Sequence, residues 1–306
     1  MTFSPAPEEL ETTDCPICGP DIEQIAQHDF STYRVVRCAR CGLVFLSPRL
    51  TEQAILKLYS DQEYYVSEEY ISHSDTKSSL TDHAYHLARS FMLRKKHNLL
   101  MQLNGGKPGT LLDIGSGTGY FAGYMKNRDW NVTGIELSER AREYSISRFG
   151  ISVFDPDNIS AVEDGYADCI TMWHVLEHLY DPGRWMSEIR RVLKDNGHCI
   201  VALPNTNSAD FKWFGPAWAA LDVPRHLWHF SPGNLKKFVR NYGFSCIRVK
   251  PMPLDIFYIS ILSYRNHGCR VPFLVGVLSG LFLSLVNIFN RGKASSLIYV
   301  LTKQTL

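Results

Sequence analysis

The chain has 306 residues, of which 45% are hydrophobic and 21% charged, and its formal net charge is +1. This length fits one large domain with a small appendage, and a net charge so near zero argues against extensive binding to nucleic acid. The first 14 residues are polar and acidic and lack the apolar core of a signal peptide. We therefore expect a cytoplasmic protein whose eight cysteines do not form a disulfide framework.

Two Cys-x-x-Cys-Gly motifs lie near the start of the chain. Their cysteines are Cys15, Cys18, Cys38 and Cys41. Each motif directs two thiolates to one point, and together the four match the closed tetrahedral site that structural Zn²⁺ prefers. We expect residues 1–50 to form a zinc-ribbon module, because so small a core requires the metal for stability.

Residues 51–81 follow as a predicted linker or lid. A short helix is expected over 51–58, and the remainder is rich in Tyr, Ser, Asp and Glu. Its aromatic side chains either close over a bound ligand or pack locally; they include Tyr64, Tyr65 and Tyr70. A longer helix is expected over 81–103, and the Gly- and Pro-rich turn at 104–109 ends it.

From residue 110 onward, predicted strands and helices alternate, which is typical of a parallel sheet with crossover helices. The predicted strands are 110–114, 131–136, 151–154, 167–173, 197–203, 244–250 and 296–303. The predicted helices lie near 119–127, 138–149, 182–194 and 231–242. We therefore expect an α/β fold whose main domain covers residues 82–306.

The stretch Thr110–Phe121, TLLDIGSGTGYF, is predicted to be a buried strand that ends in a glycine turn. Alternate glycines let the backbone pass close to a ligand, and their spacing is not the G-x-G-x-x-G of dinucleotide binders. The next strand ends in Glu136, where a carboxylate can accept hydrogen bonds from both ribose hydroxyls of a nucleoside. This pair of features indicates a nucleoside-binding site.

The run Asp113-x-Gly115-x-Gly117-x-Gly119 resembles motif I of the class I S-adenosylmethionine (SAM)-dependent methyltransferases. Seven strands in this order also match the Rossmann-like sheet of that family, whose last strand is antiparallel. The resemblance covers about residues 82–303 and implies that SAM is the cofactor. It implies cofactor-binding roles for Asp113, Gly115, Ser116, Gly117, Gly119, Glu136, Leu137, Asp155 and Trp173. Among these, Glu136 would hold the ribose and Asp155 the adenine.

The segment Cys169–Pro182 is similar to one in ubiquinone-biosynthesis O-methyltransferases and their bacterial relatives. Some of those bind a divalent metal with Glu-x-x-Glu-His, whereas this chain has His174-Val-Leu-Glu177-His178, with histidine in place of the first carboxylate. Three interpretations stay open. One is a general base at His174 or His178, another is a divalent metal at the acceptor site, and the third is a structural role in which Glu177 and His178 bond nearby backbone.

A long aromatic insertion at 206–232 is expected to cover the acceptor, because sheets of this kind bind ligands at the carboxyl ends of their strands. Its segment Asp222–Phe230 resembles one that recurs in a bacterial subgroup of these enzymes. His226 is a further candidate for the general base, and Arg225 is a candidate for holding an anionic group of the acceptor. The alternative is a stacked, salt-bridged loop that only shapes the pocket.

Residues 251–292 form a predicted apolar helical insertion, and 271–289 carries no charge. A spanning helix is disfavoured because residues 296–303 must return to the sheet. Two interpretations stay open: a buried or dimer-forming helix pair, and a helix that lies in a membrane surface. The segment has two stripes, the small residues Gly276, Gly280 and Ser284 on one and the large residues Leu274, Leu278, Leu281 and Leu285 elsewhere. Peripheral membrane contact and a homodimer are thus both compatible with the sequence.

We therefore expect methyl transfer from SAM to a small-molecule acceptor such as a sugar, polyketide, quinone-like or lipid-linked metabolite, with S-adenosylhomocysteine as product. One alternative is an RNA methyltransferase that binds RNA through the zinc ribbon, which has four arginines at Arg34, Arg37, Arg40 and Arg49. The near-zero charge and the absence of an Asn/Asp-Pro-Pro-Tyr motif oppose it. The other alternative is a non-catalytic SAM-binding or protein-docking module.

Overall fold

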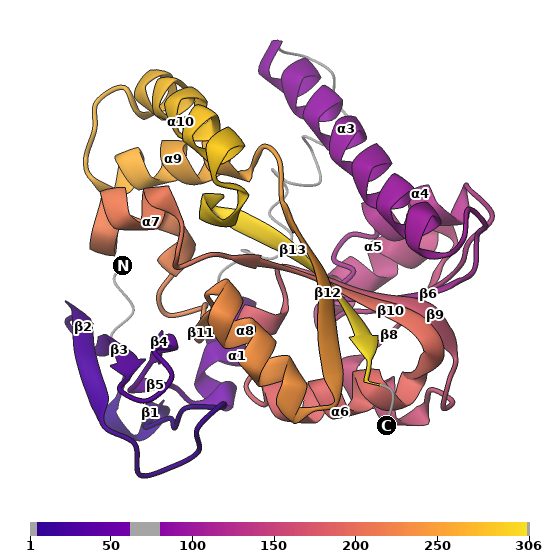
Figure 1. The fold of residues 1–306 in the computed structure, drawn as a ribbon, viewed down its shortest axis with the longest axis horizontal. Helices are drawn as coiled ribbons and strands as arrows, with labels where there is room; N and C mark the ends of the chain where they lie inside the picture. Colours follow the sequence, from indigo (N-terminus) through magenta and orange to yellow (C-terminus); the bar gives the residue numbers. More distant parts are fainter. Residues whose placement is uncertain (1–4, 62–79, 305–306) are drawn as a thin grey trace.

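A seven-stranded sheet forms the centre of the molecule (Figure 1). The computed structural model describes residues 5–61 and 80–304, so the predicted lid residues Tyr64, Tyr65 and Tyr70 lie outside it. The strand order is β12-β13-β10-β9-β6-β7-β8. The last strand, β13, runs antiparallel to both of its neighbours, and the remaining pairs are parallel. The predicted α/β fold with an antiparallel last strand is thereby confirmed.

The strands of this sheet are β6 (Thr110–Ile114), β7 (Asn131–Ile135), β8 (Ser152–Phe154), β9 (Ala167–Trp173), β10 (Leu193–Pro204), β12 (Phe244–Pro251) and β13 (Ser296–Lys303). All seven predicted strands are present. The largest difference is at β10, which begins at Leu193 instead of residue 197. Leu193 pairs with Ala167, and the next paired residue of β10 is His198, which pairs with Cys169. The residues between Leu193 and His198 form an irregularity in the strand.

Helices cover both faces of the sheet, because neighbouring strand residues point to opposite sides. Leu111 belongs to a hydrophobic cluster with α3 and α4, whereas Leu112 belongs to a second cluster with α6 and α8. Figure 1 shows these two pairs of helices on opposite sides of the sheet. The helices are α3 (Leu80–Leu103), α4 (Tyr120–Lys126), α5 (Glu139–Phe149), α6 (Pro182–Val192) and α8 (Pro232–Asn241).

The helix boundaries follow from capping residues in the sequence. The side chains of Ser138, Asp181 and Ser231 each accept a backbone N–H in the first turn of α5, α6 and α8. Gly150, at φ +62°, ends α5 in the left-handed conformation that glycine adopts without strain. These caps fix where each helix begins or ends, and so where the loops at the carboxyl edge of the sheet start.

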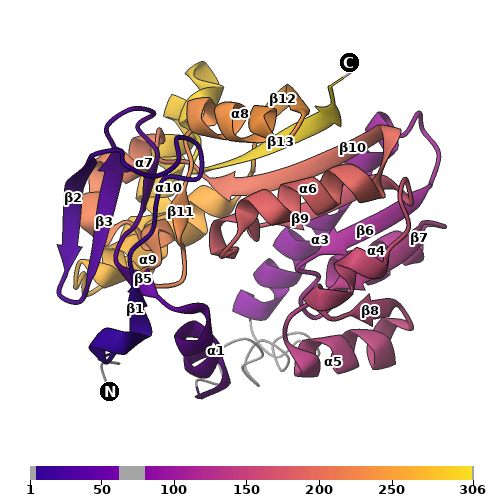
Figure 2. The same ribbon diagram turned by 90° about the horizontal axis from the view of Figure 1, so that it is seen from below.

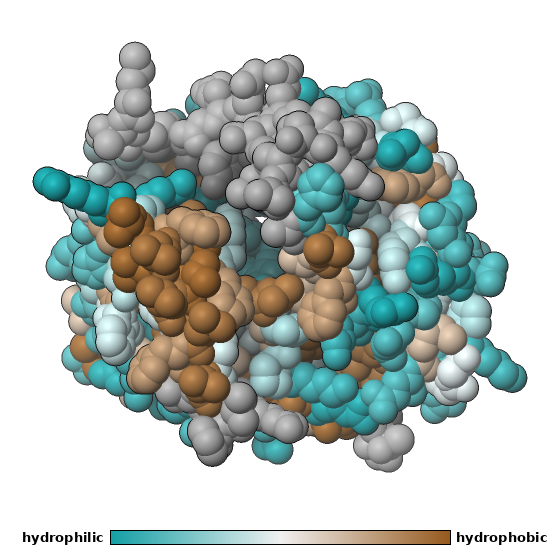
Figure 3. Space-filling view, turned by 90° about the horizontal axis from the view of Figure 1, so that it is seen from above, coloured by the Kyte–Doolittle hydropathy of each residue, from teal (hydrophilic) through white to brown (hydrophobic). Residues whose placement is uncertain are grey.

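The insertion before β13 is a pair of packed helices, α9 (Asp255–Asn266) and α10 (Pro272–Phe289). A Cβ built on Gly276 or Gly280 would lie 2.6 or 2.7 Å from Ile261 or Phe257 of α9, so glycine is required for this close approach. The predicted leucine stripe of α10 lies exposed on the outer side, where Figure 3 shows a hydrophobic (brown) face. Among the described residues, no helix combines the length and the apolar character needed to cross a membrane.

A second, four-stranded sheet contains the N-terminal segment, at the left of Figure 2. Its strands are β2 (Gln24–Phe30), β3 (Tyr33–Cys38), β4 (Val44–Leu46) and β11 (Trp228–His229). The sequence did not predict β11, which comes from the long insertion and pairs antiparallel with β4. The remaining short elements are β1 (Leu10–Glu11), β5 (Arg49–Leu50), α1 (Glu52–Asp61), α7 (Ala209–Phe214), and the 3₁₀ turns Pro7–Glu9, Pro156–Ala161, Leu176–His178, Gly215–Ala217, Ala219–Leu221 and Arg291–Lys293.

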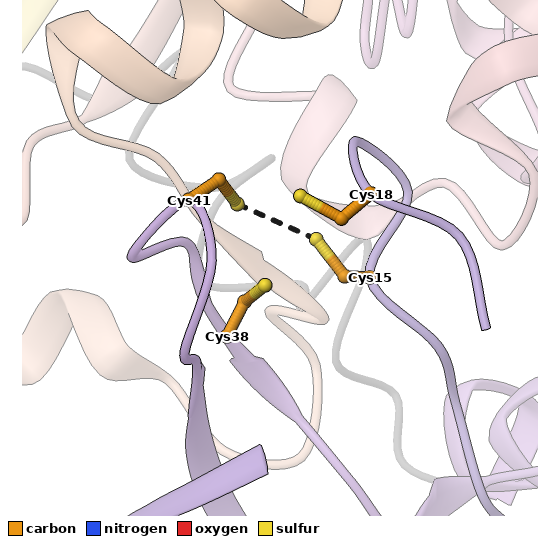
Figure 4. A group of neighbouring side chains, drawn as sticks. All are labelled: Cys15, Cys18, Cys38 and Cys41. Atoms are coloured by element: carbon orange, nitrogen blue, oxygen red, sulfur yellow. Dashed lines mark hydrogen bonds between the residues drawn. The ribbon is translucent and has the colours of Figure 1, made fainter. Parts of the chain in front are cut away.

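The four predicted zinc ligands converge on one point (Figure 4). Each cysteine offers a sulfur that lies within 4.8 Å of the other three. Gly19 and Gly42, at φ +78° and +74°, close the two turns by donating their N–H groups to the carbonyls of Cys15 and Cys38. Four thiolates in this arrangement are compatible with a structural Zn²⁺.

The zinc ribbon shares its hydrophobic core with the main domain. Phe45 of β4 and Phe238 of α8 belong to the same buried cluster. Main-chain bonds reinforce the contact, since Leu46 N–H donates to the carbonyl of Leu227 at 3.0 Å. The side-chain amide of Asn234 also donates to the carbonyl of Cys41 at 2.7 Å. Unfolding of the ribbon therefore exposes part of the main core.

Cys38→Ser removes one of the four thiolates, and we expect it to lower the midpoint of thermal unfolding of the whole chain by roughly 5 °C or more. Zinc chelation of the unmodified protein is expected to have the same direction of effect. Differential scanning calorimetry with zinc quantification measures both. The matched control is Cys269→Ser, which lies outside the cluster. A ribbon that melts in a separate transition, with the main transition unchanged, would contradict the shared core.

Candidate active site

A cavity of about 320 Å³ opens at the carboxyl ends of β6, β7 and β9. Gly115, Gly117 and Glu136 line one part of it. His178 and Arg225 line another part, together with Tyr180 and residues of α1 and α6. The cavity therefore joins the predicted cofactor residues to the predicted acceptor residues, as expected for parallel sheets that bind ligands at this edge.

The glycine loop leaves open space for a ligand. Gly115 and Gly117 adopt φ +69° and +55°, a region that other residues rarely occupy. A Cβ on Gly115 would lie 2.4 Å from Val175, whereas a Cβ on Gly117 would meet nothing within 4 Å. A side chain at position 117 would thus project toward the cavity that this residue lines. The loop fits the close backbone approach of a bound nucleoside cofactor.

The carboxylate of Glu136 is 4% exposed and held by two backbone donors. Its Oε2 accepts from Gly117 N–H at 2.8 Å and its Oε1 from Ser138 N–H at 2.9 Å. Because each oxygen retains a further lone pair, the same carboxylate can accept from two neighbouring hydroxyls of a ligand. This geometry fits the ribose of the cofactor that the resemblance implies.

Asp113 lies behind the glycine loop and is 2% exposed. It accepts a 2.6 Å hydrogen bond from the hydroxyl of Thr171. Burial raises the pKa of Asp113 to about 7, although Thr171 and the charge of Lys96 act in the opposite direction. The ammonium group of Lys96 lies 4.0 Å from the ring centroid of Trp173, and burial lowers its pKa to about 8. The sequence did not single out Lys96, because one lysine in a charged helix carries no motif.

The remaining predicted cofactor residues surround this region. Leu137 is 48% exposed and lines the cavity. Gly119 is the N-cap of α4. The hydroxyl of Ser116 and the indole N–H of Trp173 are buried without a hydrogen-bond partner among the described residues. The carboxylate of Asp155 caps the following 3₁₀ turn and lies 3.1 Å from Arg142, next to the cavity-lining Pro156. Their ligand contacts stay predictions.

His174 is held between two carboxylates. Its Nδ1 lies 3.3 Å from Glu177 Oε1 and its Nε2 lies 3.2 Å from Asp255 Oδ2. Burial alone would lower the pKa of His174, but the two carboxylates outweigh it and raise the pKa to about 10. At neutral pH the ring is therefore an imidazolium with no lone pair to accept a proton. Asp255 was not predicted, because it lies far along the chain in the apolar insertion.

His178 has the opposite character. Its Nδ1 lies 3.1 Å from the carbonyl of Arg225, and we assign the ring proton to this nitrogen, which leaves Nε2 as an acceptor. Burial and the nearby charge of His226 lower the pKa of His178 to about 4. The ring is therefore neutral at physiological pH. Since His178 also lines the cavity, it is placed to accept a proton from a bound molecule.

His226 packs behind His178, with ring centroids 4.6 Å apart in an edge-to-face arrangement. Its Nδ1 lies 2.9 Å from the carbonyl of Ala220, and its Nε2 lies 3.7 Å from Asp222. Asp222 also pairs with the guanidinium of Arg225, which lines the cavity. The acceptor loop, which we define as Asp222–Phe230, thus contributes one cation at the cavity and one histidine behind it.

Glu177 connects these groups. It is 1% exposed, and its Oε2 has no hydrogen-bond partner among the described residues. Ligand atoms of Glu177, His178 and His226 lie within 4.8 Å of one another, close enough to hold one metal ion. Two imidazoles and one carboxylate suit a transition metal or zinc better than Mg²⁺. The divalent metal at the acceptor site stays a prediction, and its third ligand would be His226, since His174 is engaged by Asp255.

Comparison with known proteins decides the family. Residues 84–249, more than half of the chain, match a family model described as a methyltransferase domain. The chain belongs to this methyltransferase family. The predicted resemblance is confirmed at this level, and SAM is the cofactor that the family and the cavity both indicate.

Several curated relatives are ubiquinone biosynthesis O-methyltransferases. The protein of Cupriavidus pinatubonensis is 26% identical over 164 residues, which cover 48% of this chain and 66% of the relative. That of Alkalilimnicola ehrlichii is 29% identical over 156 residues, covering 45% and 62%. This methyltransferase thus spans less than two thirds of these relatives' length in the matched regions.

Among solved structures, a Burkholderia thailandensis 1,6-didemethyltoxoflavin-N1-methyltransferase with bound S-adenosylhomocysteine has a TM-score of 0.51 and 14% identity. The match covers 92% of this chain and all of that one. A second structure, described as a sarcosine dimethylglycine methyltransferase from Galdieria sulphuraria, also gives a TM-score of 0.51 and covers 73% of this chain. At such low identity the likeness shows the shared fold only.

The pKa of His174 predicts how stability depends on pH. Because the folded-state pKa of about 10 lies above the ordinary value of about 6.5, protonation of this ring stabilises the fold. That contribution is complete below about pH 6.5 and is lost as the pH rises through 10. His174→Gln should therefore lower the free energy of unfolding most at low pH. The difference in this free energy between the variant and the unmodified protein should shrink toward pH 10. Urea unfolding from pH 6 to 10 measures this, with exposed His267→Gln as control. A difference in the free energy of unfolding that does not change with pH would contradict the ion pairs of His174 with Glu177 and Asp255.

Proposed function

We propose that this chain transfers a methyl group from SAM to a small molecule bound between His178 and the acceptor loop. The observation that carries the proposal is the continuity of one cavity from Gly117 and Glu136 to His178 and Arg225. The family membership and the relatives named as O-methyltransferases support the same reaction class.

The residues of the cavity have separate roles in binding the cofactor and in accepting a proton. When bound, SAM supplies a methyl group on a sulfonium, which an acceptor oxygen, nitrogen or carbon attacks in line. Glu136 holds the ribose, and Gly117 leaves space for the cofactor beside it. Holding the methyl group in line with the attacking atom of the acceptor lowers the barrier to transfer. His178 Nε2 is placed to accept the proton of an acceptor hydroxyl as its oxygen attacks the methyl group.

Two charged groups orient the acceptor side. The imidazolium of His174 compensates the buried charge of Glu177 and so keeps that carboxylate beside His178 and His226. We assign His174 a positioning role, because it has no free lone pair. Arg225 offers a guanidinium at the cavity for a carboxylate, phosphate or phenolate of the acceptor. A small acceptor with a negative or ionisable group is therefore the best fit.

Glu136→Ala is expected to weaken SAM binding by roughly 10- to 100-fold, because it removes charged acceptors from two hydroxyl groups. Isothermal titration with SAM and with S-adenosylhomocysteine measures the loss. Exposed Glu139→Ala, on the first turn of α5, is the matched control and should bind normally. Equal affinity in the two variants would show that the cofactor does not use Glu136.

His178→Gln is expected to reduce kcat by roughly 10²- to 10⁴-fold while SAM binding stays unchanged. In the unmodified protein, kcat should not fall on the acid side until the pH approaches 4, since the pKa of His178 is lowered to about 4. Steady-state rates from pH 5 to 8 measure both effects, with His267→Gln as control. A kcat that falls with an apparent pKa near 6.5 would indicate another base.

The acceptor class is tested by incubation of the protein and methyl-labelled SAM with fractions of cell extract. We expect label in polar metabolites or lipids, lost with Glu136→Ala. Label in RNA, lost when Arg34 and Arg37 are replaced, would overturn the proposal in favour of an RNA methyltransferase. Stoichiometric SAM binding without label in any fraction would identify a non-catalytic module.

A further inference from the structure

The outer face of α10 is apolar along its described length. The exposed side chains of this helix up to residue 285 are Phe273, Leu274, Leu278, Leu281, Phe282 and Leu285, each 52–66% exposed. A surface helix of a soluble protein normally presents polar residues on this side. A continuous apolar face of this kind marks a contact with another surface. Figure 3 shows it as a brown area beside a hollow in the centre of the view.

This face is not the packing side of the helix. The opposite side carries Gly276, Gly280 and the buried Leu283, and it packs on α9. Sequence and packing therefore separate two functions on one helix. The small residues allow α10 to pack on α9, whereas the large residues lie exposed and are available to a partner.

The charges around the helix identify the partner. Between residues 255 and 293 the sequence has four cations, Arg265, Arg270, Arg291 and Lys293, and one acid, Asp255. Arg265 and Arg270 are exposed and pair with no acid among the described residues. Asp255 is turned inward to His174. The helix thus begins beside two exposed cations, Arg265 and Arg270, and the stretch 255–293 contains no exposed acid.

Helix α7, which contacts α9, carries a further exposed basic residue. Lys212 is exposed and lies near Lys293, whose pKa is lowered by burial and by the charge of Lys212. The acid of this helix, Asp210, is buried and bonded to Trp218.

We propose that the outer face of α10 docks on the surface of an anionic lipid bilayer, with the helix lying in the plane of the membrane. Leucine and phenylalanine side chains enter the boundary between headgroups and acyl chains, and Arg265 and Arg270 contact lipid phosphates. A second copy of this chain fits less well. A two-fold pairing through α10 would bring together two segments that each carry four cations and one acid.

The helix pair that carries the docking surface begins beside the active site. Asp255, the first residue of α9, contacts His174 at the cavity. The hairpin that touches the bilayer therefore begins at the acceptor side of the site. The proposal stands independently of the acceptor's identity, because it depends only on the surface of α10 and its charges.

The test is co-sedimentation of the full chain with vesicles of phosphatidylcholine alone and of phosphatidylcholine mixed with phosphatidylglycerol. We expect binding to the anionic vesicles, weakened by added salt. Leu278→Gln together with Leu281→Gln should reduce the partition coefficient by roughly tenfold or more. Arg265→Gln with Arg270→Gln should reduce binding and its salt dependence. The matched control is Ile247→Gln, an aliphatic residue 54% exposed on β12.

Folding and oligomeric state are measured on the same variants. All of the substituted side chains are exposed, so thermal unfolding and SAM affinity should match the unmodified protein. Absence of binding to anionic vesicles, or equal binding by the leucine double variant, would overturn the proposal. A dimer in light scattering that the leucine variant converts to a monomer would overturn it in favour of self-association.

Discussion

The buried charge of Glu177 is the constraint around which the acceptor side is built. An ionised carboxylate with so little exposure is costly unless a positive charge and hydrogen bonds compensate it. His174 supplies the positive charge, and Asp255 in turn holds His174 from the opposite side. The end of β9 and the start of α9 are thereby fixed to one another by a three-membered ionic chain.

The same residue also fixes the acceptor loop through its backbone, since the carbonyl of Glu177 accepts from Leu227 N–H at 2.8 Å. Local strain accompanies this arrangement. His174, Asp222 and Leu254 have φ of +58°, +41° and +73°, in a region that side chains other than glycine rarely adopt. His174 is a member of the ionic chain, Leu254 precedes Asp255, and Asp222 lies in the acceptor loop. Asp21, Ser31 and Asp129 also have positive φ, so such residues are not confined to this site.

The sequence predicted the features whose cause is local. The strands follow from apolar runs, and the turn at Gly115 and Gly117 was recognisable from the alternate glycines, although the close contact of Gly115 with Val175 was not. The zinc ligands follow from short spacing within each Cys-x-x-Cys turn. In these cases the interacting residues lie close together in the chain, so the pattern can be recognised without knowledge of the fold.

Features that depend on tertiary contacts were not predictable. Lys96 and Asp255 have no motif around them, and their charges matter only because the fold brings them to Asp113 and His174. The choice between His174 and His178 as general base also depended on information that the sequence lacks. Their different pKa values arise from the partners of each ring, two carboxylates for one and a carbonyl for the other.

The pairing of β4 with β11 has a consequence for biosynthesis. Phe45 pairs with Trp228, so β4 leaves the ribosome more than 180 residues before the strand that completes its sheet. Local zinc binding can order the two cysteine turns early, whereas the edge of β4 stays open until the acceptor loop arrives. An open strand edge is a site for wrong pairing between chains. The nascent protein therefore has a period in which its N-terminal module holds metal but lacks its last strand.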